Sequence, residues 1–292
     1  MERSAGADFG ALLEEWQIAS PERVSLGASG ERPGARLGSG LEFHDRRNYS
    51  AGDDLRRLDW RALARSDQVL IRLAREEIAP RLELLIDLSA SMDVEPQKAE
   101  LVRGLTALLA SLARQAGWPA VVYGLGSPPR RLSLEVLASA AGPAHADFAR
   151  ELGFSPGPPV GDALRLVRPM LAAGALRIVV SDFLGGDPTR ALGDLAGGAS
   201  ALVLIQVLGT EEARPEPGGH VRLVDAESGV ESEIELDGRA VARYTQRLSA
   251  LAAALAEGAR RAGGLFVPLM ADVSLASAAR DHLGPAGVLE PA

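Results

Sequence analysis

The 292-residue chain contains no cysteine. This absence excludes disulfide frameworks, thiolate zinc sites, iron–sulfur clusters and thiol catalysis. The four histidines are scattered without the spacing of metal ligands, which argues against a zinc site built on histidine. The longest strongly apolar run, residues 201–208, is far too short to cross a membrane. Any chemistry in this chain must therefore depend on oxygen and nitrogen side chains, and we expect no integral membrane segment.

Lysine is nearly absent as well. Lys98 is the only lysine among 31 basic residues, and the arginine-rich, alanine-rich and glycine-rich composition is typical of a GC-rich genome. Acidic residues nevertheless outnumber basic ones, and the formal net charge is −8. An acidic chain matches a phosphate backbone poorly, so nucleic acid is not an expected partner. The first residues lack the apolar core of a signal peptide, and we expect a cytoplasmic protein.

Three regions differ in composition along the chain. Residues 1–30 are predicted to form an N-terminal helix and linker, and residues 31–80 a turn-rich, highly charged accessory segment. From residue 81 onward, short apolar runs alternate with helical periodicities. This alternation predicts an α/β domain over residues 81–292 with a doubly wound, mostly parallel sheet.

The expected strands are short and apolar, and leucine recurs at helical spacing in the segment after the first of them. The predicted strands are residues 82–88, 120–125, 131–134, 176–181, 200–208 and 265–269, with a hairpin over 221–224 and 233–236. One predicted helix begins near Pro96 and is stopped by Gly117 and Pro119. The others cover residues 162–171, 239–262 and 274–282.

Polar residues follow the first apolar run of this predicted sheet. Asp87 ends the run, Ser89 and Ser91 follow at alternate positions, and a second apolar strand ends at Asp182. Ligands of open α/β sheets bind at the carboxyl ends of strands, and carboxylate and hydroxyl oxygens suit Mg²⁺. The four residues therefore predict a metal site, provided that the two strands are neighbours. The alternative for the first three residues is a cap on the following helix.

This pairing resembles the von Willebrand factor A-like fold and its metal-ion-dependent adhesion site. The resemblance implies that the Asp-x-Ser-x-Ser run supplies the first metal loop and that Asp182 is a later ligand. The middle ligand of that family is a threonine. The corresponding stretch here has no threonine and offers Ser155 or Asp162 instead. The adhesion site is therefore expected to be degenerate, with weak Mg²⁺ binding or none.

A second group of polar and aromatic residues lies around a Gly-Asp-Asp turn in the accessory segment. Its distinctive members are Arg47, Tyr49, Gly52, Asp53, Asp54, Arg56, Leu58, Asp59, Trp60 and Arg65. The string resembles the signature of the domain of unknown function 58 family, whose members join it to a von Willebrand factor A-like domain. Asp225 and the helix containing Tyr244 also fit the pattern, so the resemblance covers residues 32–268.

We interpret the accessory segment as mainly architectural, with a minority of its residues contacting a partner. Trp60 and Tyr49 are expected to pack against the sheet domain, where their aromatic surfaces are most useful. Asp53, Asp54 and Asp59 are expected to pair with nearby arginines. A surface recognition patch would show the same pattern, and it remains the alternative.

The family resemblance implies a non-enzymatic protein-interaction or adaptor protein, because family members commonly occur beside MoxR-type AAA+ ATPases. The expected partners are such an ATPase and a client protein whose complex is assembled or matured. The alternative is a Mg²⁺-dependent phosphotransferase or hydrolase with Asp87 as nucleophile. An enzyme of the haloacid-dehalogenase type needs an aspartate two residues later as general acid, and this chain has Ser89 there, so no enzymatic activity is expected.

Overall fold

The computed structural model describes residues 2–28, 46–48, 60, 65, 69–72, 80–138 and 151–292. The chain divides into two compact units. One comprises residues 1–33 and 80–292, and the other comprises residues 34–79. The N-terminal residues, which we predicted as a separate helix and linker, thus belong to the same unit as the sheet. Among the described residues, no helix is long and apolar enough to span a membrane.

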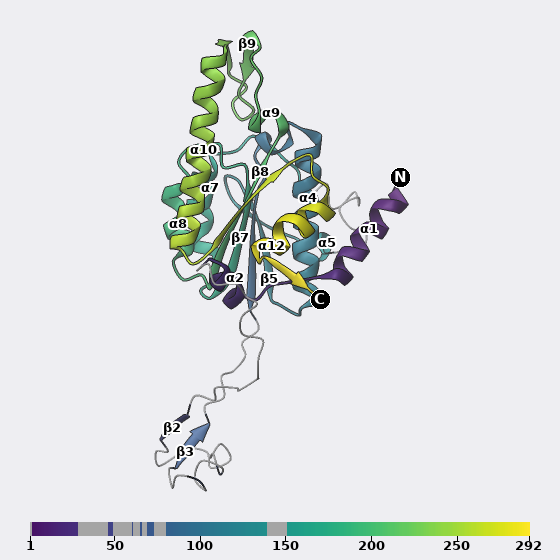
Figure 1. The fold of residues 1–292 in the computed structure, drawn as a ribbon, viewed down its shortest axis with the longest axis vertical. Coiled ribbons are helices and arrows are strands. Elements are labelled where there is room, and N and C mark those ends of the chain that lie inside the picture. Colours follow the sequence, from purple (N-terminus) through teal and green to yellow (C-terminus); the bar gives the residue numbers. More distant parts are fainter. Residues whose placement is uncertain are drawn as a thin grey trace. The chain divides into compact units, whose positions relative to one another are not determined.

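The larger unit is built around a mixed sheet that has six strands in the described part of the chain (Figure 1). They are β4 (Arg81–Asp87), β5 (Ala120–Leu125), β6 (Arg130–Leu132), β7 (Ala175–Ser181), β8 (Ala201–Leu208) and β11 (Leu265–Met270). The strand order is β11-β8-β7-β4-β5-β6, and only the β5–β6 pair at one edge is antiparallel. The predicted α/β architecture with a mostly parallel sheet is confirmed.

Helices cover both faces of this sheet (Figure 1). One face carries α4 (Pro96–Gln115) and α1 (Glu2–Glu15), and the other carries α7 (Val160–Val167), α8 (Thr189–Ala196) and α10 (Gly238–Arg261). Shorter helical segments are α2 (Pro21–Ala28), η2 (Ala90–Asp93), α5 (Leu134–Leu137), η4 (Arg168–Met170), α9 (Thr210–Ala213), α11 (Leu275–Ser277), η5 (Ala278–Leu283) and α12 (Gly284–Ala286).

The central strands owe their apolar sequences to burial on both faces. Leu84 and Ile86 of β4 belong to the core on the α4 side, whereas Leu85 belongs to the core on the α7 side. All three side chains are completely buried. Because both faces are covered, the strand is a continuous apolar run.

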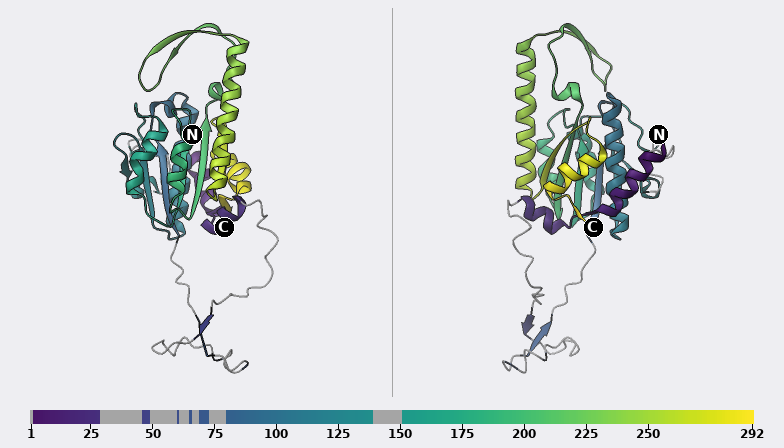
Figure 2. Two further views of the ribbon diagram at one scale, coloured as in Figure 1. Left: turned by 90° about the vertical axis from the view of Figure 1, so that its left-hand side faces the viewer. Right: turned by 45° about the vertical axis from the view of Figure 1, so that its right-hand side comes forward.

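Two antiparallel pairs complete the larger unit in its described part. β1 (Trp16–Ile18) pairs with β12 (Leu289–Pro291) and joins the two terminal segments. The predicted hairpin is confirmed as β9 (Gly219–Val224) and β10 (Glu231–Leu236). Figure 2 shows this hairpin arching from the N-terminal end of α10, with its tip bent back toward the rest of the unit.

The smaller unit is described only in part. Its β2 (Arg46–Asn48) and β3 (Leu70–Arg72) form an antiparallel pair in which Arg47 lies opposite Ile71. The Gly-Asp-Asp turn between them lies outside the described residues.

Candidate functional site

The two strands predicted to end in aspartate are neighbours. β4 and β7 pair in parallel, with Ile86 opposite Val180. Asp87 therefore ends its strand beside Ser181, and Asp182 follows one residue later. Each of the two aspartates exposes only 3% of its surface. The structure thus brings both carboxylates to the same edge of the sheet, as the sequence predicted, and we call this edge the strand-end site.

Asp87 is bound on both of its carboxylate oxygens. The Ser181 hydroxyl donates to Oδ2 at 2.6 Å, and the Ser89 N–H donates to Oδ1 at 3.0 Å. The hydroxyls of Ser89 and Ser91 lie 3.0 Å apart and hydrogen-bond to each other. Ser89 makes no side-chain capping bond to η2, so capping does not explain this residue.

Burial raises the pKa of Asp87 to about 6, and the nearby charge of Asp182 acts in the same direction. The hydrogen bonds from Ser181 and Ser89 favour the ionised form but offset only part of this effect. Asp87 is therefore a carboxyl group whose ionisation is disfavoured by the fold.

The side chain that Asp182 binds is the only lysine of the chain. Lys98, in the first turn of α4, is completely buried, and its Nζ lies 2.8 Å from Asp182 Oδ2. The same Nζ lies 2.7 and 2.8 Å from the two carboxylate oxygens of Glu212, and 2.9 Å from the carbonyl oxygen of Ser91. We call these four residues the Lys98 cluster. Three neighbouring strand ends converge on one ammonium group.

Burial lowers the pKa of Lys98, but the two carboxylates more than compensate, and the pKa lies above its ordinary value. Burial raises the pKa of Glu212 against the opposing effect of Lys98. We conclude that Lys98 remains protonated in the folded protein, because it is hydrogen-bonded to two acidic groups in a water-poor environment.

Several contacts fix Glu212 at the end of β8. The N–H of Gly209 donates to its Oε2 at 2.8 Å, and the Tyr244 hydroxyl donates to its backbone carbonyl at 2.7 Å. The Glu95 carboxylate accepts the first two N–H groups of α9. A Cβ at position 209 would lie 2.2 Å from Glu95 Oε1, so the glycine leaves the room that this carboxylate occupies. α9 is thus hydrogen-bonded to other segments at both its N-terminal and its C-terminal end.

The predicted metal ligands make other contacts within the protein. Both carboxylate oxygens of Asp182 are engaged, Oδ2 by Lys98 and Oδ1 by the N–H of Leu184 at 2.9 Å. Both oxygens of Asp87 are engaged as well, and the two serine hydroxyls bind each other. Among the described residues, no three His, Cys, Asp or Glu side chains are grouped to hold a metal ion.

The two residues that could have replaced the missing threonine have other contacts. The N–H of Ser155 donates to the carbonyl of Leu88 at 2.9 Å, and the Ser155 side chain lines a neighbouring pocket. The Asp162 carboxylate pairs with Arg165 one turn along α7. Neither residue joins the Lys98 cluster.

A carboxylate from the β9–β10 hairpin also reaches the strand-end site. Glu227 accepts the N–H of Ser91 at 2.9 Å, that of Ala90 at 3.3 Å and that of Gly157 at 2.7 Å. Asp225 shapes the hairpin tip, since its Oδ1 accepts the N–H groups of Glu227 and Ser228. Three backbone donors from two separate loops therefore hold one acidic side chain from a third segment.

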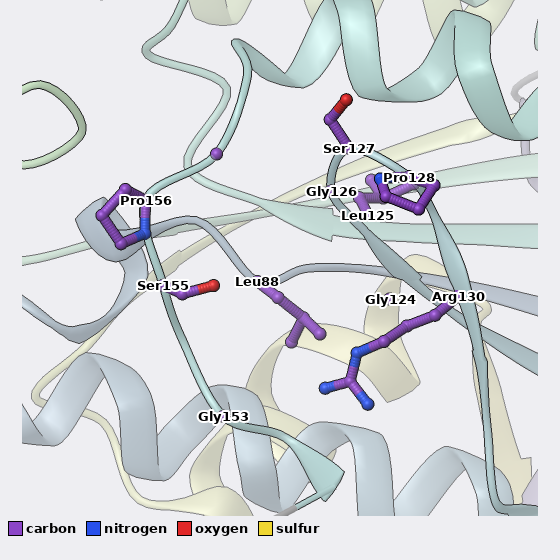
Figure 3. A pocket seen from close by; sticks show the side chains of 11 residues that line it. Leu88, Gly124, Leu125, Gly126, Ser127, Pro128, Arg130, Gly153, Ser155 and Pro156 are labelled. Carbon is purple, nitrogen blue, oxygen red and sulfur yellow. The ribbon is translucent and has the colours of Figure 1, made fainter.

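A pocket of about 220 Å³ is lined in part by Gly157. It opens between the end of β5, the loop that follows Leu88 and the segment 153–157. Figure 3 shows Arg130 and Leu88 on its walls, and the Arg130 guanidinium donates to the carbonyl of Glu151. The pocket borders the loop that binds Glu227, but none of its lining residues belongs to the Lys98 cluster.

The accessory motif can be placed only in part. Tyr49, Gly52, Asp53, Asp54, Arg56, Leu58 and Asp59 lie outside the described residues. Trp60 is 63% exposed, and Arg65 is also exposed. The architectural role of this segment, including the packing of Trp60, stays a prediction.

The sequence analysis missed three contributors to the strand-end site. Glu212 has a weaker signal than Asp182, because it lies in the short helix after a buried strand and not at the strand end itself. Lys98 has a signal in being the only lysine. Glu227 has none, because a glutamate in a polar hairpin tip is ordinary, and only the tertiary structure brings it to residue 91.

The chain matches the family described as "Protein of unknown function DUF58" over residues 45–253, more than two thirds of its length. The chain therefore belongs to the DUF58 family. Its curated relatives include uncharacterized proteins of Mycobacterium tuberculosis and Mycobacterium bovis. Each is 27% identical over 282 residues, covering 89% of this chain and 83% of the relative.

Comparison with solved structures finds weaker likeness. A conserved hypothetical protein BatB from Bacteroides thetaiotaomicron matches with a TM-score of 0.37 and 13% identity, over 70% of this chain and 94% of that one. An aerotolerance-related membrane protein from Bacteroides fragilis matches with a TM-score of 0.35 and 14% identity, over 69% and 96%.

The pKa of Asp87 predicts a specific dependence of stability on pH. A folded pKa of about 6 against 3.8 when unfolded means that the folded state holds this proton more tightly. The stabilisation is complete below the unfolded pKa and is lost as the pH rises through about 6, a change of about 3 kcal/mol. The unfolding free energy of Asp87→Asn minus that of wild type should therefore rise by about 3 kcal/mol as the pH goes from about 3.5 to about 7.5, as measured by urea unfolding.

Asp93→Asn is the matched control, because Asp93 is exposed just beyond the same loop. Its unfolding free energy should follow the wild-type pH profile. Parallel profiles for wild type and Asp87→Asn would show that Asp87 ionises as freely in the fold as in the unfolded chain.

Proposed function

We propose that this protein is a non-enzymatic adaptor that works with a MoxR-type AAA+ ATPase in the assembly or maturation of a client complex. The proposal takes its domain to be von Willebrand factor A-like. A parallel sheet with helices on both faces and a polar loop after β4 supports this assignment. The ATPase partner rests on the resemblance of the accessory motif to proteins that occur beside such ATPases.

The observation that carries the proposal is the set of three backbone N–H groups that bind the Glu227 carboxylate. An adaptor must recognise side chains of another protein, and the strand-end site already holds a carboxylate from a separate segment on three backbone N–H groups. Backbone donors that converge in this way favour negative charge. An aspartate or glutamate side chain of a partner would bind the same three N–H groups when the hairpin moves away from them.

The surroundings of Glu227 suit a protein partner. Leu223, Val224 and Val230 of the same hairpin are large apolar residues that are 49%, 57% and 60% exposed. Apolar side chains around a charge-recognising centre are a common feature of protein interfaces.

The environment of Asp87 favours the adaptor proposal over the alternative of a phosphotransferase or hydrolase. A nucleophilic carboxylate must be ionised and must reach the substrate. Asp87 is 3% exposed, both of its oxygens accept hydrogen bonds, and burial raises its pKa. The burial and the two accepted hydrogen bonds leave these oxygens little access to a substrate.

The test is the affinity of the purified full chain for the MoxR-type ATPase of the same genome, measured by calorimetry. Glu227→Gln weakens the intramolecular contact by removing its charge, which costs about 1 kcal/mol, so the ATPase should bind about fivefold more tightly. Glu233→Gln, exposed on β10 of the same hairpin, is the control and should bind like wild type.

Two results would count against the proposal in different ways. If neither wild type nor Glu227→Gln binds the ATPase, the partner is wrong. If both bind with equal affinity, the strand-end site is not where the ATPase is recognised.

A further inference from the structure

We propose that the ammonium group of Lys98 is the resident cation of the strand-end site and that it binds the Asp182 carboxylate expected to hold a divalent metal ion. This inference concerns the chemistry of the site and does not depend on the identity of any partner.

The coordination of Lys98 is that of a small cation among oxygen ligands. Its Nζ lies between 2.7 and 2.9 Å from oxygens of Asp182, Glu212 and Ser91. These are the distances of charge-assisted hydrogen bonds. The ligands come from the segments that follow β7, β8 and β4, three adjacent parallel strands. The ammonium lies at the convergence point that the sheet topology assigns to a ligand.

The ammonium also occupies one carboxylate oxygen of the predicted metal site. Asp182 was predicted as a metal ligand, and its Oδ2 binds Lys98 while its Oδ1 accepts the N–H of Leu184. Ser91 was predicted to bind through its hydroxyl, but that hydroxyl pairs with Ser89 and its carbonyl binds Lys98. A divalent ion would have to displace an ammonium that is already paired with two carboxylates.

The identity of this residue fits the role. The chain uses arginine at 30 of its 31 basic positions, so a lysine here is against the general preference. A guanidinium is a planar fork that suits bidentate pairs, whereas an ammonium is a compact charge with three donors on a flexible stem. Oxygens that converge on one point from three directions require the compact cation.

The location of Lys98 in its helix supports the same conclusion. Lys98 is the third residue of α4, and its side chain is completely buried. The N-terminus of a helix carries partial positive charge, which disfavours a cation there. The two carboxylates supply the negative charge that stabilises a buried ammonium at this end, so anions that follow other strands determine where the lysine lies.

The first test compares thermal unfolding of the full chain with and without excess Mn²⁺. The wild-type melting temperature should not respond to Mn²⁺. Lys98→Met, which removes the charge and keeps the stem, should melt about 10 °C lower, because the buried Asp182 carboxylate and the partly buried Glu212 carboxylate lose their partner. Arg114→Met, exposed in the last turn of the same helix, is the matched control and should melt like wild type.

A second variant separates lost charge from lost packing. Lys98→Met combined with Asp182→Asn and Glu212→Gln has no charge left in the cluster and should recover most of the lost melting temperature. If Lys98→Met fails to fold, this triple variant decides the matter. A triple variant as unstable as Lys98→Met would show that charge pairing is not what Lys98 contributes.

A third variant tests the equivalence of the two cations. Lys98→Ala leaves two carboxylates beside an open space, and Mn²⁺ should raise its melting temperature, an effect that Asp182→Asn in the same background should remove. A Lys98→Ala protein that does not respond to Mn²⁺ would contradict the equivalence. Stoichiometric Mn²⁺ binding to wild type, lost in Asp182→Asn, would overturn the proposal and restore a metal site.

A direct observation of the ammonium is also possible, because the chain has one lysine. Protein labelled with [¹⁵N]lysine should give a single side-chain ammonium signal, protected from rapid exchange and not broadened by Mn²⁺. Selective broadening of that signal at stoichiometric Mn²⁺ would place the metal in the cluster and contradict the proposal.

Discussion

Replacing Arg177 with methionine is expected to lower the free energy of unfolding by about 3–5 kcal/mol. Arg177 on β7 lies directly opposite Glu83 on β4, and its Nε is 3.0 Å from Glu83 Oε2. Glu83 is completely buried and Arg177 is 3% exposed. Without the guanidinium, the buried Glu83 carboxylate would keep only the N–H of Ala172 at 2.8 Å and the distant Arg81 Nε at 3.9 Å.

The double variant Glu83→Gln with Arg177→Met separates this charge effect from the other contacts of the arginine. Its guanidinium also donates to the carbonyls of Ala172, Leu195 and Gly197, so we expect the double variant to recover stability only in part. Urea unfolding of both proteins measures the difference. A double variant no more stable than Arg177→Met would show that the charge of Glu83 is not the cause.

The exposed pair of Arg222 and Glu231 on the hairpin is a suitable control. Its two side chains lie 3.3 Å apart but are 64% and 54% exposed. Exposed ion pairs contribute at most about 1 kcal/mol, so Arg222→Met should change the unfolding free energy far less than Arg177→Met.

The regular elements of the sheet were predictable because burial on both faces leaves a direct trace in the sequence. β5 and the helices α4 and α10 begin and end within a few residues of their predicted bounds. β1 and β12 were not predicted, because three-residue strands have no measurable period. Their pairing joins segments more than 270 residues apart, and only the assembled core brings them together.

The strand-end site shows where a sequence pattern stops being sufficient. Both aspartates were placed correctly at neighbouring strand ends, because each follows a buried run. The pattern could not show that Asp182, which lies one residue beyond the position opposite Asp87, binds a different partner. Asp87 pairs with Ser181, whereas Asp182 turns to Lys98 on the α4 side. Contacts across 84 and 114 residues in the chain leave no local signal.

Ser91 connects the two features of the site that the sequence did not reveal. Its carbonyl accepts a hydrogen bond from Lys98, and its N–H donates to Glu227. The backbone of η2 is therefore hydrogen-bonded through the Ser91 carbonyl to the buried ammonium and through the Ser91 N–H to the hairpin carboxylate. A partner that displaces Glu227 would act on a loop whose inner side is fixed, so we expect the exchange to be local.

Replacing Phe183 with alanine should cost about 3–5 kcal/mol, since this completely buried ring packs in the core on the α7 side. Phe183 directly follows Asp182 and has a φ of 58°, in the left-handed region that large side chains rarely adopt. This turn directs the N–H of Phe183 to Ser181 Oγ at 3.0 Å and the N–H of Leu184 to Asp182 Oδ1 at 2.9 Å. The turn thus orients Asp182 toward Lys98.

The glycine variant at the same position tests whether the turn is strained. Glycine in a helix is less stable than alanine by about 1 kcal/mol, but at a positive φ it adopts the backbone without steric cost. Phe183→Gly should therefore unfold at the same or a higher urea concentration than Phe183→Ala. At Leu192, buried in the middle of α8, the order should be the usual one, with alanine more stable than glycine. If glycine is the less stable residue at both positions by the same margin, the backbone at Phe183 carries no strain, and the ring alone accounts for the residue.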